Sequence, residues 1–191
     1  MSDDTAQPRY IGWRYWRAGK MDLDGEIRAV LVSPLRGRVN RWLDAGDRTA
    51  TCLRAHAIPA PECSCGFRVT RSLPDLVHFM RLRHQNGKDS PTIVIGRVEG
   101  FGRAQQGLSP SAGWNVRDCA TTIRVEHMRI IGPLFFSPAI AVWQNDFHRY
   151  FPVQRTSSGI GTYQQWLTRI SRLPDAKRRQ PWPSAPTEAT P

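Results

Sequence analysis

Lysine is scarce in this chain of 191 residues, which has 3 Lys against 24 Arg. Long apolar runs are missing as well. The most apolar segment, residues 130–142, is interrupted by Gly132, Pro133, Ser137 and Pro138, and it falls short of the roughly 20 residues that cross a bilayer. The opening residues, MSDDTAQPRY, are acidic and polar, which is not a secretory pattern. We therefore expect a soluble, cytoplasmic protein without a membrane partner.

The sequence also lacks the short motifs that mark several classes of enzyme. It contains no G-x-S-x-G, no P-loop, no H-E-x-x-H and no deaminase signature. Gly100-Phe101-Gly102 is a lone G-x-G that no capped helix follows, so it does not make a dinucleotide loop. Glu126 and His127 are neighbours on an expected strand, where adjacent side chains point to opposite faces. These absences favour a non-enzymatic protein.

The hydrophobic content of 40% is enough for one globular domain with its own core. We expect a single α+β domain over residues 10–173, preceded by a mobile lead-in over residues 1–9. The segment 174–191 is rich in proline, carries a basic cluster and has no repeating apolar face, so it is predicted to be a disordered tail.

Apolar spacing within the domain predicts strands over 26–33, 92–100 and 121–131, and helices over 72–87 and 162–173. Three glycines interrupt the second of these strands and are typical of a bent or bulged strand: Gly96, Gly100 and Gly102. The pattern predicts a small, curved, mostly antiparallel sheet or partly open barrel with two helices.

Four potential metal ligands lie close together in the order C-x3-H-x6-C-x-C: Cys52, His56, Cys63 and Cys65. Zinc prefers thiolate and imidazole ligands. Three thiolates with one imidazole make a closed structural site. We therefore predict a zinc knuckle here, in which Cys119 is an alternative fourth ligand. Two other interpretations remain open: a small core cysteine beside a reduced C-x-C turn, or an unusual redox pair.

The net charge of +11 comes from 27 Lys+Arg against 16 Asp+Glu. Arginine contacts phosphates and stacks on bases, and tryptophan rings stack on bases too. The candidate nucleic-acid contacts are Arg9, Trp13, Arg14, Trp16, Arg17, Arg36, Arg38 and Arg41 near the start, Arg81 and Arg83 on the first helix, and Lys177, Arg178 and Arg179 in the tail. The alternative is that the tryptophans are core residues and that the arginine excess reflects genome composition.

Several segments follow one another in a familiar order: Gly12-Trp13-Arg14-Tyr15-Trp16-Arg17, Leu31-Val32-Ser33-Pro34, Trp42, Ala50-Thr51-Cys52, Ala60-Pro61-Glu62-Cys63-Ser64-Cys65-Gly66 and Ile95-Gly96-Arg97-Val98-Glu99-Gly100-Phe101-Gly102. This order resembles a loosely defined group of small actinobacterial and actinophage proteins, which have a Trp-rich start, a C-x-C-G segment and a later glycine-rich strand. The resemblance implies an actinobacterial or phage origin and carries over no catalytic role.

The leading hypothesis is a non-enzymatic, intracellular protein that associates with DNA or RNA and is stabilised by a structural zinc ion. The alternative is a protein-interaction module, such as a phage factor that binds a host protein. Its support is the 7 Trp and the apolar pair Phe135-Phe136. A Cys/His enzyme is the third hypothesis.

Overall fold

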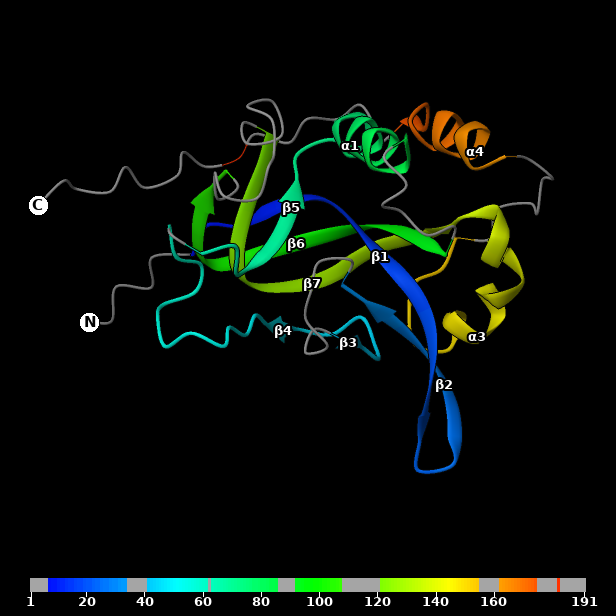
Figure 1. The fold of residues 1–191 in the computed structure, drawn as a ribbon, viewed down its shortest axis with the longest axis horizontal. Coiled ribbons are helices and arrows are strands. Elements are labelled where there is room, and N and C mark those ends of the chain that lie inside the picture. Colours follow the sequence, from blue (N-terminus) through cyan, green and yellow to red (C-terminus); the bar gives the residue numbers. More distant parts are fainter. Residues whose placement is uncertain are drawn as a thin grey trace, which may run out of the picture.

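The computed structural model describes residues 7–33, 41–61, 63–85, 92–107, 121–154, 162–174 and residue 182. The strands are β1 (Tyr10–Leu23), β2 (Glu26–Val32), β3 (Arg41–Trp42), β4 (Arg48–Thr49), β5 (Phe67–Thr70), β6 (Ile93–Gln106) and β7 (Thr122–Phe136). The helices are α1 (Leu73–Gln85), α3 (Gln144–His148) and α4 (Tyr163–Ile170), and η2 (Pro138–Trp143) is a 3-10 helix. Figure 1 shows these elements, which confirm the predicted α+β class.

The strands form one sheet in the order β3-β2-β1-β5-β7-β4, and β6 pairs with both β1 and β7. Every pair of these strands is antiparallel. The strand β5 also pairs with both β1 and β7. The four strands β1, β6, β7 and β5 therefore form a closed circuit of pairings. The circuit is thin at the single β1–β5 pair, Trp13 with Thr70. The predicted curved, mostly antiparallel sheet is therefore confirmed.

Glycines bend β6 where it crosses the sheet. The register between β6 and β7 shifts just after Gly96 and again just after Phe101. A Cβ atom on Gly96 would lie 2.4 Å from Cδ2 of Leu134, so the two strands approach here only because the side chain is absent. Gly102 has a φ of +79°, a conformation that favours glycine. The predicted bulged strand is confirmed at these positions.

The hydrophobic core has two parts, one on each side of β1. Trp16, with no exposed surface, belongs to a cluster with residues of β2, β3, β5, β6 and β7. Trp13 and Tyr15, each 5% exposed, belong to a second cluster with α1 and α4. The aromatic residues at the start of the domain are therefore core residues. One face of β1 packs in the first cluster and the other face packs in the second.

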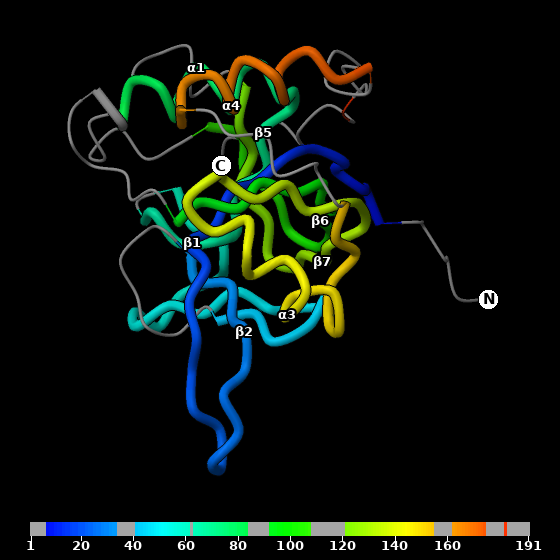
Figure 2. The backbone as a smooth tube through the Cα atoms, turned by 90° about the vertical axis from the view of Figure 1, so that its right-hand side faces the viewer, coloured from blue at the N-terminus to red at the C-terminus, as the bar shows by residue number. Residues whose placement is uncertain are grey.

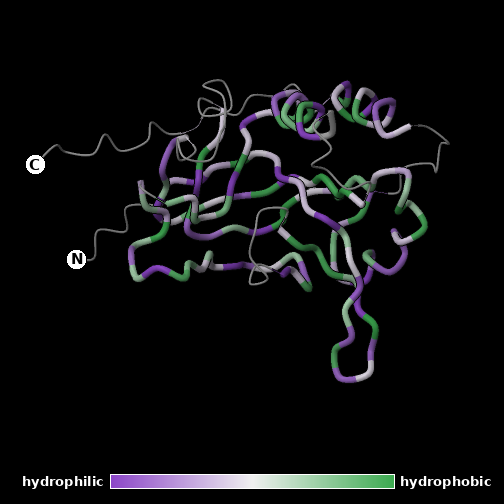
Figure 3. Tube along the Cα trace, in the orientation of Figure 1, coloured by the Kyte–Doolittle hydropathy of each residue, from purple (hydrophilic) through white to green (hydrophobic). Residues whose placement is uncertain are grey.

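The layers are clear in two views of the chain. The helices α1 and α4 lie side by side on one side of the sheet, and the β1–β2 hairpin projects from the opposite side (Figures 1 and 2). The hairpin turns through Asp24 and Gly25, whose φ angles are 54° and 83°, as a tight two-residue connection requires. Figure 3 shows hydrophobic stretches along the central strands and a mixture of hydrophobic and hydrophilic residues along the hairpin.

The structure differs from the expected elements in several places. The aromatic segment after Tyr10 is a long strand, and residues 138–148 form η2 and α3, which the sequence did not predict. Trp182 lies in the tail predicted to be disordered, yet its Nε1 donates to the Ile11 carbonyl oxygen at 2.9 Å. Its ring meets that of Tyr10 edge-on, with centroids 6.2 Å apart. The prediction is therefore wrong for Trp182, because aromatic packing and a hydrogen bond hold it on β1.

Among the described residues, no helix has both the length and the apolar character needed to cross a membrane.

Candidate metal centre

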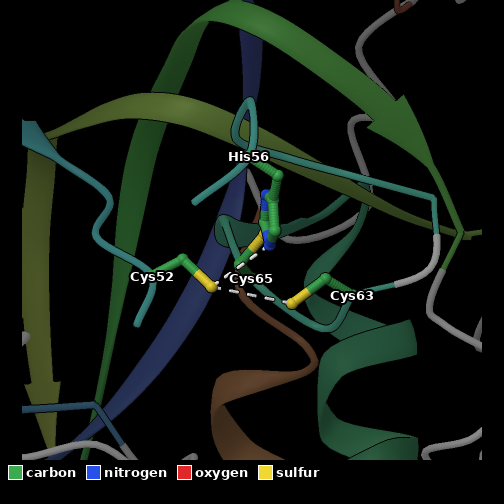
Figure 4. Close-up of side chains that lie close together, drawn as sticks. All are labelled: Cys52, His56, Cys63 and Cys65. Carbon is green, nitrogen blue, oxygen red and sulfur yellow. Dashed lines mark hydrogen bonds between the residues drawn. The ribbon is translucent and has the colours of Figure 1, made fainter. Parts of the chain in front are cut away.

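The four predicted ligands converge on one point, as Figure 4 shows. Cys52 Sγ lies 3.3 Å from His56 Nε2 and 3.7 Å from Cys63 Sγ. Cys65 Sγ lies 4.0 Å from the same nitrogen. The ligand atoms of all four residues lie within 4.8 Å of one another, which is close enough to hold a metal ion.

These distances can be compared with those of a tetrahedral metal site. With metal–sulfur bonds of about 2.3 Å, tetrahedral geometry separates two sulfurs by roughly 3.8 Å. The 3.7 Å between the sulfurs of Cys52 and Cys63 matches that edge. Three sulfurs and one nitrogen also fill the four positions of such a site, so a metal bound here would have no open coordination position.

The loop that carries the ligands runs from β4 to β5 and is held near both ends. At its start, the amide of Ala50 donates to a β7 carbonyl oxygen at 2.8 Å, two residues before Cys52. At its end, Gly66 follows Cys65 with a φ of +93°. A Cβ on Gly66 would lie 3.1 Å from Cβ of Pro59, so a glycine is required both by conformation and by space.

A hydrogen bond orients the imidazole of His56. Its Nδ1 lies 2.8 Å from the carbonyl oxygen of Ala57, which can only accept. Nδ1 therefore carries a proton, and Nε2 faces the sulfurs of Cys52 and Cys65. The bond to Ala57, and then one to Cys63, raise the pKa of His56. A histidine ligand held in this way is typical of metal sites.

The thiols of Cys63 and Cys65 differ in acidity. Burial acts to raise the pKa of Cys63, but hydrogen bonds from the Cys65 backbone and from His56 outweigh it and lower the pKa to about 7. Burial raises the pKa of Cys65. Because the metal-bound form of cysteine is the thiolate, Cys63 supplies it more readily than Cys65, and binding of a metal would release protons.

Arg124 on β7 lies against the ligand loop and is 1% exposed. Its Nη1 donates to the carbonyl oxygens of Ala60 at 3.0 Å, Cys65 at 3.1 Å, and Cys63. Its Nη2 donates to Oε1 of Gln105 on β6 at 2.7 Å. In the sequence, Arg124 is one residue of the strand expected over 121–131. Nothing in the local pattern indicated that a distant loop would cover it.

The predicted nucleic-acid contacts near the start of the chain are mostly unsuited to that role. Trp13, Arg14 and Trp16 are 5%, 6% and 0% exposed. The Arg14 guanidinium lies over the rings of Trp16 and Phe67 and donates to Ser33 Oγ at 3.0 Å. The prediction that Trp13, Arg14 and Trp16 contact nucleic acid is wrong, because packing inside the domain leaves their rings and guanidinium no free face.

The remaining predicted contacts divide by position. Arg9 is paired with the buried Glu99 at 2.9 Å, Arg17 is half-buried and Arg41 is exposed. The other candidates near the start of the chain and all those in the tail lie outside the described residues: Arg36, Arg38, Lys177, Arg178 and Arg179.

The helical layer of α1 and α4 keeps its basic character. Arg81 Nη2 donates to Thr168 Oγ1 at 2.8 Å and so ties the two helices together. The layer, residues 72–85 and 162–174, has four arginines: Arg81, Arg83, Arg169 and Arg172. Its single acidic residue, Asp75, is 8% exposed and accepts from Ser72 Oγ at 2.5 Å. Arg169 and Arg172 are exposed, whereas Arg81 and Arg83 are half-buried.

No protein-family model, curated protein or solved structure matches this chain. The actinobacterial or phage origin implied by the resemblance therefore stays a prediction. Function is inferred below from the geometry and charge of the described residues.

Proposed function

We propose that this protein is a non-enzymatic, nucleic-acid-associated protein whose fold is stabilised by a structural zinc ion. The observation that carries the zinc proposal is the convergence of Cys52, His56, Cys63 and Cys65 within 4.8 Å. Three thiolates and an imidazole are a donor set that zinc prefers, and four protein ligands are typical of structural rather than catalytic zinc.

The nucleic-acid proposal rests on the helical layer of α1 and α4. Arg169 and Arg172 are exposed in this layer and Arg81 is half-buried, and the only carboxylate of residues 72–85 and 162–174 is the buried Asp75. Phosphate oxygens are the natural partners of exposed guanidinium groups, and such contacts do not depend on base sequence. DNA or RNA of any sequence is therefore the expected ligand of this face.

Fluorescence anisotropy with a labelled oligonucleotide, titrated over a range of salt concentrations, tests this face. We expect the combined variant Arg81→Gln, Arg169→Gln, Arg172→Gln to bind more weakly. The slope of log K against log salt should decrease in magnitude by about 2 to 3, since each phosphate contact contributes roughly 0.7 to 0.9.

A second triple variant removes the same charge elsewhere and serves as the control. It neutralises arginines that are paired with carboxylates, namely Arg28 with Glu26, Arg48 with Asp44, and Arg103 with Glu126. We expect its slope to stay within about 0.5 of the wild type. Absence of binding at low salt would overturn the proposal, and an equal effect of both triple variants would overturn the location of the face.

A second candidate function, protein interaction, is favoured by the β1–β2 hairpin. It projects from the sheet on the side away from the helical layer (Figures 1 and 2), and Ile27 on it is 62% exposed. An exposed apolar residue on a projecting hairpin can contact another protein. The support from Phe135 and Phe136 is lost, because these residues are only 3% and 1% exposed.

Co-purification after nuclease treatment separates the two functions. If the protein is an interaction module, a defined partner should survive nuclease, disappear with Ile27→Asp and persist with the triple variant of the helical layer. A partner lost on nuclease treatment, or insensitive to Ile27→Asp, contradicts docking through the hairpin.

A further inference from the structure

Arg124 is a buried cation whose contacts converge on the metal-ligand loop. It is 1% exposed, and its guanidinium reaches the carbonyl oxygens of Ala60, Cys63 and Cys65. On its other side it donates to Gln105 Oε1 at 2.7 Å and to the Gly107 carbonyl oxygen at 3.3 Å. A single side chain thus joins the loop to the end of β6.

A buried guanidinium needs a negative partner, because transfer of an isolated charge from water to the interior is costly. The hydrogen-bond acceptors of Arg124 are neutral carbonyl and amide oxygens. Burial lowers the pKa of Arg124, whereas Cys65 and Cys63 act in the opposite direction when they are ionised. Thiolates of the cysteine cluster would therefore supply Arg124 with a counter-charge.

The charge of the metal-bound cluster fits this pairing. A divalent ion with three thiolates and a neutral imidazole carries a single net negative charge. The half-buried cluster would be poorly solvated with that charge alone, and the guanidinium of Arg124 offsets it, with Arg68, its neighbour on β5, also acting on Cys65. Arginine suits the position better than lysine, since its planar fork donates several hydrogen bonds in fixed directions.

We propose that Arg124 is a positioning residue of the metal centre, which fixes the carbonyls of the ligand loop and balances the negative charge of the metal-bound cluster. This inference rests on the proposed zinc site. It assigns to a residue outside the ligand set a share of the metal affinity, in addition to any share in folding.

Competition with a chromogenic zinc chelator tests the inference on purified full-length variants. We expect Arg124→Met to weaken zinc binding by about 10- to 100-fold, the range typical when a partner of the ligand shell is removed. Arg124→Lys should recover part of the loss, because it restores the charge but not the fork.

The matched control is Arg14→Met, which also removes a buried arginine from the sheet. Arg14 makes its hydrogen bonds to Ser33 and to the Arg68 carbonyl oxygen, not to the ligand loop. We expect its zinc affinity to stay within about threefold of the wild type even if its stability falls.

The outcomes separate the inference from the zinc proposal. A wild-type protein that binds no zinc overturns the zinc site, and this inference falls with it. A zinc-binding wild type whose affinity is unchanged in Arg124→Met overturns this inference alone, as does equal weakening in Arg14→Met. Should Arg124→Met fail to fold, Gln105→Leu removes one acceptor while leaving the guanidinium, and unchanged affinity in both Gln105→Leu and Arg124→Lys also overturns it.

Discussion

The Cys63 thiol is the ligand whose removal separates a structural metal centre from a catalytic one. We expect Cys63→Ser to lose its zinc and to unfold at a lower temperature, because a metal site that closes a loop contributes its binding energy to folding. Metal content and thermal unfolding measure the two effects. Cys119→Ser, outside the four-ligand set, should retain the metal. An intact, metal-bound Cys63→Ser protein would contradict the site, and loss of a turnover with an intact fold would favour a Cys/His enzyme.

The Glu99 carboxylate makes the stability depend on pH. Burial acts to raise its pKa, but hydrogen bonds from Arg9 and Arg129 outweigh it and hold the pKa below its usual range. Its contribution is thus complete above the pKa of an unfolded glutamate, about 4.3, and is lost as the pH falls through the lower folded value.

Urea unfolding of the wild type and Glu99→Gln at several pH values measures this contribution. We expect the wild type to be the more stable at pH 6, with the difference shrinking below about pH 4. A difference that stays constant with pH would contradict the role given to the ion pairs.

At the scale of single residues, the sequence predicted the metal ligands but not the residue that contacts the ligand loop, Arg124. Cys52, His56, Cys63 and Cys65 are close in the chain, so spacing and ligand chemistry were enough to group them. Arg124 is about 60 residues beyond Cys63 and Cys65 and meets them only through the pairing of β5 with β7. Strand alternation separates the two faces of a strand, but it does not show what covers either face.

At the scale of elements, β6 is a strand that is sensitive to added volume. We expect Gly96→Ala to destabilise the protein by about 1–3 kcal/mol, since the new methyl group would press on Leu134 and on the Trp16 ring, both fully buried. Chemical denaturation measures the loss. Gly19→Ala is the matched control on β1, where the new atom would lie at an ordinary 3.5 Å from Val30. Equal losses in both variants would contradict the close approach of β6 and β7.

The elements differ in how clearly their sequences indicate them. The helix α4 was predicted because its apolar residues recur at helical spacing, and the structure adds a capping box between Thr162 and Gln165. The strand β1 was not predicted, because Trp13 and Tyr15 serve one core cluster while Trp16 serves the other. A strand buried on both faces has no alternation of polar and apolar residues to reveal it.

At the scale of the whole molecule, two features lie on opposite sides of the sheet. The basic helical layer of α1 and α4 covers one side, and the β1–β2 hairpin projects from the other (Figure 1). Net charge alone did not locate a binding face, because Arg14 proved to be buried and Arg9 paired with Glu99. Within the helical layer, Arg169 and Arg172 remain exposed on one defined surface.

Removal of the metal should affect part of the molecule more than the rest. The loop between β4 and β5 carries all four ligands. The helical layer packs on the sheet elsewhere, against Trp13 and Tyr15. We expect chelation by EDTA to expose the backbone amides of residues 50–66 to hydrogen exchange before those of α1. Uniform loss of protection over the whole chain would contradict a local role of the metal.

The metal centre is tested most directly by elemental analysis of the purified protein combined with titration of its thiols. We predict one zinc per chain, with three of the four cysteines unreactive until a chelator is added. Metal-free protein with four reactive thiols would contradict the centre.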